Sequence, residues 1–182
     1  MLDTLNLKAD DILAPIDCEH LLIEKYPDCK LKTKVNLLNL KKGEERLSVK
    51  TVPERLGVGD AEQIALLMNE CYPEMWGEVT ADNILALMSG SEAVWLGIKL
   101  ESKLVFGYAM LIPIVSHVTW IATSPQQENK GYATSIVSML VKVCLSVADT
   151  AIIDVVDDNA SANRMYAKVG FKPYKSYFLL KT

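Results

Sequence analysis

Apolar residues recur along the chain with two periods, which separate expected helices from expected strands. Helical spacing places apolar side chains on one face of four segments, at residues 60–72, at 80–90, directly after Gly131, and at 159–169. Short apolar runs typical of strands stand at 92–100, 104–115, 117–124, 151–156 and 176–180. Strands joined by hairpin-length loops and mixed with helices predict one sheet with both pairing directions, covered by helices.

Local signals set the expected ends of the first two helices. Asp60 and Gln63 form a capping box, and Pro73 ends that helix or follows its end. Thr80 caps the second helix, which stops near Gly90. The residues expected to face the core are Ile64, Leu67 and Met68 in the first helix, Ile136, Val137, Leu140, Val141 and Cys144 in the third, and Ala162, Met165, Tyr166 and Val169 in the fourth.

The N-terminal part differs from the rest in charge. Residues 1–24 carry six acids against one lysine, whereas residues 25–50 carry eight bases against three acids. We interpret it as a short helix capped by Asp17, a strand at 30–40, and a turn at Gly43 that leads into another strand, with their charges paired or solvated. The alternative is a basic surface, from Lys25 to Lys50, that docks an acidic partner.

Composition places the chain among soluble globular proteins. Its 182 residues suit one domain, or one domain with a small extension, and half of them are apolar. A net charge of -4 and a pI of about 5.2 argue against general nucleic-acid binding. No secretory signal and no apolar run long enough for a bilayer are present, so we expect a cytoplasmic protein without membrane contact.

The four cysteines are scattered and include no C-x-x-C pair, so no metal site is expected. We expect reduced and mostly buried thiols. A disulfide between Cys18 and Cys29 stays open as the alternative.

The polar loop before the third helix is the first candidate for chemistry. Gly131 allows close backbone approach and Ala133 keeps the first helical turn open, so the free N–H groups of the helix start can cradle phosphate oxygens. Taken alone, the pattern fits an ordinary turn between a strand and a helix equally well.

A second motif downstream indicates what this loop could bind. The sequence Gly131-Tyr132-Ala133, with Pro125 ahead of it, resembles the end of the acyl-CoA signature of the GCN5-related N-acetyltransferase (GNAT) family. The family's second pattern is matched by Asn159, Ala162, Tyr166, Lys168, Gly170 and Phe171. The resemblance covers roughly residues 47–180. It implies the GNAT acyltransferase fold over 47–182, an α/β (α+β) domain with a mixed, mostly antiparallel sheet and helices on both faces, and leaves 1–46 as an N-terminal helix and hairpin extension.

The resemblance implies acetyl-CoA as the acyl donor. The pantetheine arm would bind the main chain of Ile121, Ala122 and Thr123, where the strand parts from its neighbour. The pyrophosphate would bind the N–H groups of Glu128, Asn129, Lys130, Gly131, Tyr132, Ala133 and Thr134, and Asn159 would touch the cofactor besides capping its helix. Glu128 departs from the family, which usually has Arg or Gln there, and its charge lowers the expected affinity, while Lys130 compensates in part.

Tyr166 stands where the family keeps a tyrosine near the thiolate, so the resemblance implies a general acid. The alternative is a core tyrosine. His117 begins the pantetheine strand, shares its parity with Thr119 and Ile121, and is the candidate base, because an unperturbed imidazole titrates at about 6.5. A satisfied structural histidine is equally open, and Asp154 on the next strand is the rival base.

The acceptor would meet the loop between the first two helices. Tyr72 and Trp76, with Glu74 and Glu78, can surround a cationic amine or simply pack and be solvated. We therefore predict transfer of an acetyl group to a primary amine, on a small molecule or a peptide. A non-catalytic acyl-CoA-binding or interaction module on the same fold is the alternative, and a homodimer stays open.

Overall fold

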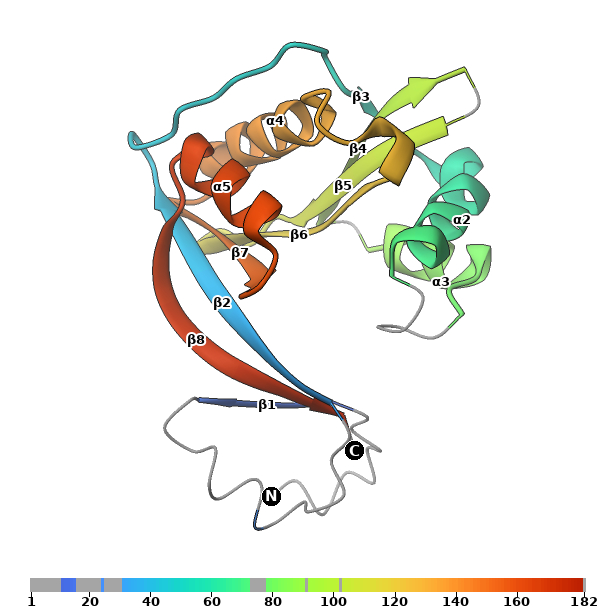
Figure 1. Ribbon diagram of the computed structural model, residues 1–182. Coiled ribbons are helices and arrows are strands. Elements are labelled where there is room, and N and C mark those ends of the chain that lie inside the picture. Colours follow the sequence, from blue (N-terminus) through green and yellow to red (C-terminus); the bar gives the residue numbers. More distant parts are fainter. Residues whose placement is uncertain are drawn as a thin grey trace.

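One mixed sheet organises the molecule (Figure 1). The computed structural model describes residues 11–15, 24, 31–72, 78–90, 92–101 and 103–181. In this part of the chain the sheet has eight strands in the order β1-β8-β2-β7-β6-β5-β4-β3, and only β6 and β7 run parallel. The strands are β1 (Asp11–Pro15), β2 (Leu31–Lys41), β3 (Glu54–Arg55), β4 (Ala93–Leu100), β5 (Lys103–Met110), β6 (Val115–Thr123), β7 (Thr150–Val156) and β8 (Lys172–Lys181). The expected mixed, mostly antiparallel sheet is confirmed.

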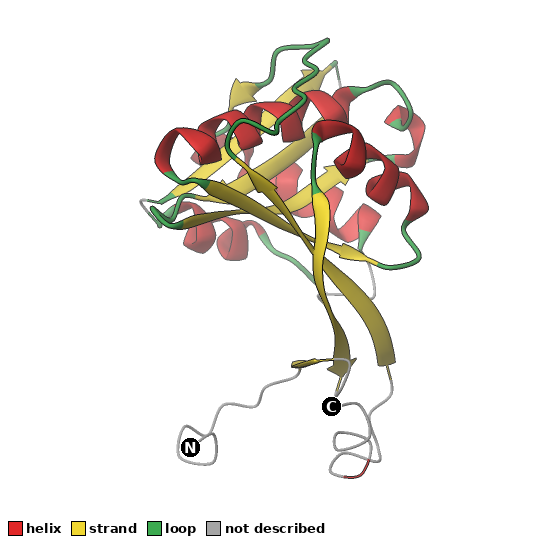
Figure 2. Ribbon diagram, turned by 90° about the vertical axis from the view of Figure 1, so that its left-hand side faces the viewer, coloured by secondary structure: helices red, strands yellow, loops and turns green. Residues whose placement is uncertain are grey.

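Helices cover both faces of this sheet, as expected (Figures 1 and 2). The helices are α2 (Ala61–Cys71), α3 (Ala81–Met88), α4 (Tyr132–Val147) and α5 (Ala160–Val169). Alternate strand residues divide between two cores, with Phe106 packing toward α2 and α3 and Val105 toward α4. All the predicted core residues are buried except Ala162 and Met165, which are partly buried and pack against the same core.

The sheet opens between β6 and β7. The two strands pair only from Val115 to Val118 and from Thr150 to Ile153, so the C-terminal half of β6 has no neighbour on that side among the described strands. The register of β6 against β5 also shifts between Gly107 and Ala109, because a β-bulge inserts one residue into β6. The gap and the bulge together position the site described below.

The strand β2 is an inner member of the sheet. It pairs with β7 on one side and β8 on the other, although the sequence assigned it to an extension that ends at residue 46. The turn at Gly43 is confirmed, with a φ of 91°. The strand expected after it is wrong, since residues 46–50 run as an irregular segment across α4 (Figure 1). The helix expected after Asp17 lies outside the described residues.

The predicted N-terminal cap is confirmed for α3 and is wrong for α2. Thr80 caps α3, because its Oγ1 accepts from the N–H of Asn83 at 3.3 Å. The predicted capping box of Asp60 and Gln63 is wrong, since the Asp60 carboxylate instead accepts from the N–H of Gly57 at 2.9 Å and from Lys99 at 2.8 Å. Pro73 lies outside the described residues.

Two further expectations concern the whole chain. No helix among the described residues is long and apolar enough to cross a bilayer. Cys71 is a half-buried free thiol and Cys144 a buried one, while Cys18 and Cys29 lie outside the described residues.

Candidate functional site

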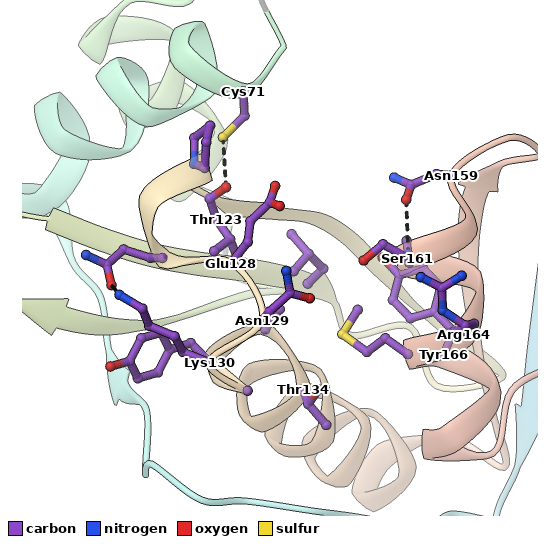
Figure 3. Close-up of a pocket in the computed structure, with 18 of the residues that line it drawn as sticks. Cys71, Thr123, Glu128, Asn129, Lys130, Thr134, Asn159, Ser161, Arg164 and Tyr166 are labelled. Atoms are coloured by element: carbon purple, nitrogen blue, oxygen red, sulfur yellow. Dashed lines mark hydrogen bonds between the residues drawn. The ribbon is translucent and has the colours of Figure 1, made fainter.

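A cleft of about 620 Å³ opens where β6 and β7 part. Its walls are the C-terminal end of α2, the end of β6, the loop into α4, and α5 (Figure 3). The residues lining it are Lys50, Glu70, Cys71, Tyr72, Ile121, Thr123, Pro125, Gln127, Glu128, Asn129, Lys130, Gly131, Tyr132, Ala133, Thr134, Asn159, Ser161, Ala162, Arg164, Met165, Tyr166 and Lys168. Two motifs that lie about 30 residues apart in the sequence thus face one space, as Figure 3 shows for Glu128 and Tyr166.

The loop into α4 leaves the start of that helix open. Asn129 and Gly131 both adopt positive φ, at 60° and 86°, and Gly131 occupies the N-cap position without a side-chain cap. The N–H groups of the first turn therefore lack protein partners within the helix and carry its partial positive charge. The Glu128 N–H, which we expected in this cradle, already donates weakly to the Pro125 carbonyl at 3.4 Å.

Cations outnumber acids around the cleft. Glu70 and Glu128 are its carboxylates, and the cations are Lys50, Lys130, Arg164 and Lys168. Lys130 lies 2.8 Å from the amide oxygen of Gln127, and Arg164 projects from α5 beside Tyr166 (Figure 3). Such a surface favours an anion with several phosphate charges.

Asn159 closes the start of α5. Its Oδ1 accepts from the N–H of Ala162 at 3.0 Å, so the capping role is confirmed. The side chain also lines the cleft, which leaves its predicted contact with the cofactor as a prediction.

Tyr166 is buried at the inner end of the cleft, 6% exposed, with its ring edge against Phe171. Burial, and then the nearby Tyr72, raise its pKa well above the ordinary value. The phenol is therefore neutral and carries its proton throughout the ordinary pH range.

Two side chains at the C-terminal end of α2, from its last residue and its C-cap, reach the open edge of β6. The Tyr72 hydroxyl donates to the Ile121 carbonyl at 2.8 Å, and the Cys71 thiol lies 3.5 Å from the Thr123 carbonyl. Burial raises the pKa of Tyr72 to about 12 and that of Cys71 to about 11, so both groups keep their protons as donors. Tyr72 thus contacts the predicted pantetheine strand.

The other predicted acceptor and arm residues lie in different places. Glu78 is exposed and does not line the cleft, and Glu74 and Trp76 lie outside the described residues. Ala122 is fully buried in the core under α2, so only its main chain could meet a ligand.

His117 lies on the sheet face opposite α4 and α5. The expected parity with Ile121 is wrong, because the bulge in β6 changes the alternation between these residues. The ring pairs with Asp154, whose Oδ2 is 2.9 Å from Nε2, an ion-pair distance without the alignment of a hydrogen bond. The two candidate bases therefore form one pair, which lies outside the lining of the cleft, next to the point where the strands part.

Asp154 also accepts a short hydrogen bond from the Tyr177 hydroxyl. Burial alone would raise the pKa of this carboxyl, but the interactions with His117 and Tyr177 outweigh burial and lower the pKa from its ordinary value. The carboxylate is consequently charged at neutral pH and can orient and stabilise a protonated imidazole.

Sequence reasoning missed several lining residues. Arg164 and Lys168 are one helical turn apart on α5, a spacing that signals a shared face. Glu70 and Cys71 gave no signal, and Lys50 was noted only as the end of a basic stretch, because tertiary packing alone brings these three residues to the cleft.

Comparisons with known proteins identify the family and the fold. The model of the acetyltransferase (GNAT) family matches residues 61–171. No curated protein sequence matches the chain. Among solved structures, a GNAT-family protein from Novosphingobium aromaticivorans superposes with a TM-score of 0.68 at 16% identity, over 99% of this chain and 78% of its own.

Two other structures share the fold. The GCN5-related N-acetyltransferase from Sphaerobacter thermophilus has a TM-score of 0.71 at 10% identity, over 94% of this chain and 58% of its own. The PaiA N-acetyltransferase from Thermoplasma acidophilum, in complex with coenzyme A, has a TM-score of 0.58 at 16% identity, over 71% of this chain and 97% of its own. The chain thus spans less than two thirds of the Sphaerobacter protein. By the family model, which covers more than half of its length, and by its fold, the chain belongs to the acetyltransferase (GNAT) family.

Proposed function

We propose that the protein transfers an acetyl group from acetyl-CoA to a primary amine. One observation carries this proposal: the uncapped start of α4 and the buried phenol of Tyr166 face the same cleft, where β6 and β7 part. The residues present suit the cofactor, because N–H groups and four cations meet its phosphates and an open strand edge meets its arm.

Bound acetyl-CoA supplies the acetyl group as a thioester, whose C–S bond breaks as the C–N bond to the amine forms. Tyr166 donates its phenolic proton toward the departing sulfur, and it suits this task because burial keeps it protonated. Tyr72, hydrogen-bonded to Ile121, holds α2 against the edge that would receive the arm.

We assign the base to the pair of His117 and Asp154. His117 lies one residue before the last paired position of β6, beside the point where the two strands part, and the amine would have to approach the cleft from this side of the sheet. It accepts the amine proton directly or through water, while the Asp154 carboxylate stabilises the resulting charge.

The decisive measurement is release of free thiol from acetyl-CoA on addition of polyamines, amino acids, aminoglycosides or peptides. Tyr166→Phe is expected to slow turnover about tenfold or more while leaving the Kd for acetyl-CoA nearly unchanged, because only the acid is lost. Tyr174→Phe is the matched control, since its exposed ring does not line the cleft. Equal turnover in all three proteins would remove Tyr166 from the mechanism.

The pH dependence tests the base. The lowered pKa of Asp154 keeps this carboxylate ionised well into the acidic range, so a fall in rate between neutral pH and pH 5 has to come from another group. We expect His117→Gln to abolish that acidic limb, and Asp154→Asn to preserve it but move it to lower pH, because a protonated imidazole loses its counter-charge. Superimposable wild-type and His117→Gln profiles would assign the base to bulk water or to another residue.

A non-catalytic acyl-CoA-binding module is the second candidate. Two features favour this candidate, because both lower the expected affinity for acetyl-CoA. Glu128 places a negative charge in the phosphate loop, and the carbonyls of Ile121 and Thr123 already accept contacts from Tyr72 and Cys71. Such a protein would bind acetyl-CoA without any amine-dependent release of thiol.

A further inference from the structure

The segment between β2 and β3 forms a strap across α4, which we define as residues 46–51 (Figure 1). Two buried serines of α4 hold it. Ser138 Oγ accepts from the N–H of Ser48 at 3.0 Å, and Ser135 Oγ accepts from those of Lys50 and Thr51 at 3.1 and 3.3 Å. At its start the N–H of Arg46 donates to the Val169 carbonyl of α5 at 2.7 Å. The strap is therefore fixed to both helices that border the cleft.

A second cavity of about 240 Å³ lies between the strap, the start of α4 and the end of α5. Arg46, Lys50 and Lys168 contribute three cations to it, and no carboxylate lines it. Its remaining lining residues are Ser48, Gly131, Thr134 and Val169. None of the three cations belongs to an ion pair within the part of the chain that the structure describes.

The second cavity adjoins the first. Lys50, Gly131, Thr134 and Lys168 line both of them, and the stem of Lys50 lies 3.6 Å from the position that a Cβ on Gly131 would occupy. A ligand whose pyrophosphate rests on the start of α4 can therefore place its nucleotide end in the second cavity.

Three unpaired cations without a carboxylate suit a dianionic phosphate. We infer that the second cavity binds the 3′-phosphate on the ribose of acyl-CoA, so that the protein discriminates acyl-CoA from its 3′-dephospho form. This inference rests on the proposed acyl-CoA binding. Arg46 and Lys50 lie outside the residues matched by the family model, 61–171, so this part of the site comes from the chain's own strap.

The experiment compares Kd values for CoA and 3′-dephospho-CoA by calorimetry at low and moderate salt. Wild-type protein is expected to bind CoA at least about tenfold more tightly than 3′-dephospho-CoA, because charge-assisted hydrogen bonds to a phosphate are stronger than hydrogen bonds between neutral groups. The double variant Lys50→Met/Lys168→Met is expected to lose this preference. Its Kd values for CoA and for 3′-dephospho-CoA should agree within about twofold, near the wild-type Kd for 3′-dephospho-CoA. Lys142→Met is the matched control, because this exposed lysine of α4 lines neither cavity.

Shorter ligands test the cavity apart from the pantetheine arm. Adenosine 3′,5′-bisphosphate should compete with CoA about tenfold better than AMP does, and millimolar inorganic phosphate should narrow the gap between CoA and its dephospho form. Equal affinity of the wild type for CoA and dephospho-CoA would overturn the inference while leaving acyl-CoA binding intact. Failure of both ligands to bind would overturn the proposed function, and this inference with it.

Discussion

The starts of α4 and α5 face the same cleft but treat their free N–H groups in opposite ways. At α4 the N-cap is Gly131, in a left-handed conformation and without a side-chain acceptor. At α5 the side chain of Asn159 accepts from the N–H of Ala162. Because both helices carry the same partial charge at this end, the capping residue decides which start can serve a ligand. We therefore expect the phosphates of the proposed cofactor at α4, whereas α5 contributes side chains to the cleft.

The largest effect is expected at Gly131, which leaves the start of α4 open. Gly131→Ala is expected to lower the free energy of unfolding by about 1–2 kcal/mol, because a Cβ is strained at positive φ. The affinity for acetyl-CoA should fall about tenfold or more as the loop relaxes and turns its N–H groups away.

Gly43→Ala is the matched control, since Gly43 has a φ of 91° and a Cβ there would meet nothing within 4 Å. Gly43→Ala should lower the free energy of unfolding, measured in urea, by a similar amount, and should leave the Kd for acetyl-CoA, measured by calorimetry, unchanged. An unchanged Kd for Gly131→Ala as well would contradict the role given to the start of α4.

A smaller effect is expected at Ser135, which ties the strap to the first turns of α4. Its Oγ accepts from two strap N–H groups and donates to the Gly131 carbonyl at 3.2 Å. Ser135→Ala should cost about 1–3 kcal/mol of unfolding free energy through unpaired amides. We also expect the Kd for CoA to rise about threefold, because Lys50 loses its anchor.

Ser138→Ala removes the parallel bond to Ser48 and serves as its comparison. Ser138→Ala should lower the free energy of unfolding in urea by about as much as Ser135→Ala does, but it should change the Kd for CoA less. Identical effects on the Kd would show that the strap acts as a whole rather than through Lys50.

Asn159→Ala tests the capped start of α5. Loss of the cap should lower the free energy of unfolding by about 1 kcal/mol. The same loss is expected for Thr80→Ala at α3, which lies away from the cleft. A Kd for acetyl-CoA that changes less than about threefold in both variants would assign Asn159 to capping alone, whereas a change confined to Asn159→Ala would add a cofactor contact.

The smallest effect is expected at Glu128, whose exposed carboxylate lies just before the start of α4. Glu128→Gln should tighten the binding of acetyl-CoA about two- to threefold at low salt, and the gain should vanish at high salt because exposed charges are screened. Binding titrations at two ionic strengths measure it. A weaker Kd would mean that the carboxylate accepts a hydrogen bond from the ligand.

Local signals were sufficient for much of the fold. The helical period predicted the buried faces of α2 and α4, and the glycine loop before α4 predicted an open helix start. These features depend on neighbouring residues, so the sequence carries them directly.

The misplaced features depend on distant parts of the chain. The bulge in β6 leaves no trace in the alternation of the strand, which is why His117 was expected on the wrong face. The Asp60 carboxylate does not cap α2, because it binds Lys99 on β4 and accepts from the N–H of Gly57 instead. Lys50 enters the site only because Ser135 holds the strap, a contact between residues 85 positions apart.

The place of β2 between β7 and β8 governs how the molecule is assembled. During synthesis this strand leaves the ribosome long before both of its partners, since Asn36 and Ser176, which form a hydrogen bond, are 140 positions apart. Until then its two edges stay unpaired, which favours slow closure and exposes the nascent chain to aggregation. Ribosome-bound chains stopped before residue 150 should therefore need a chaperone.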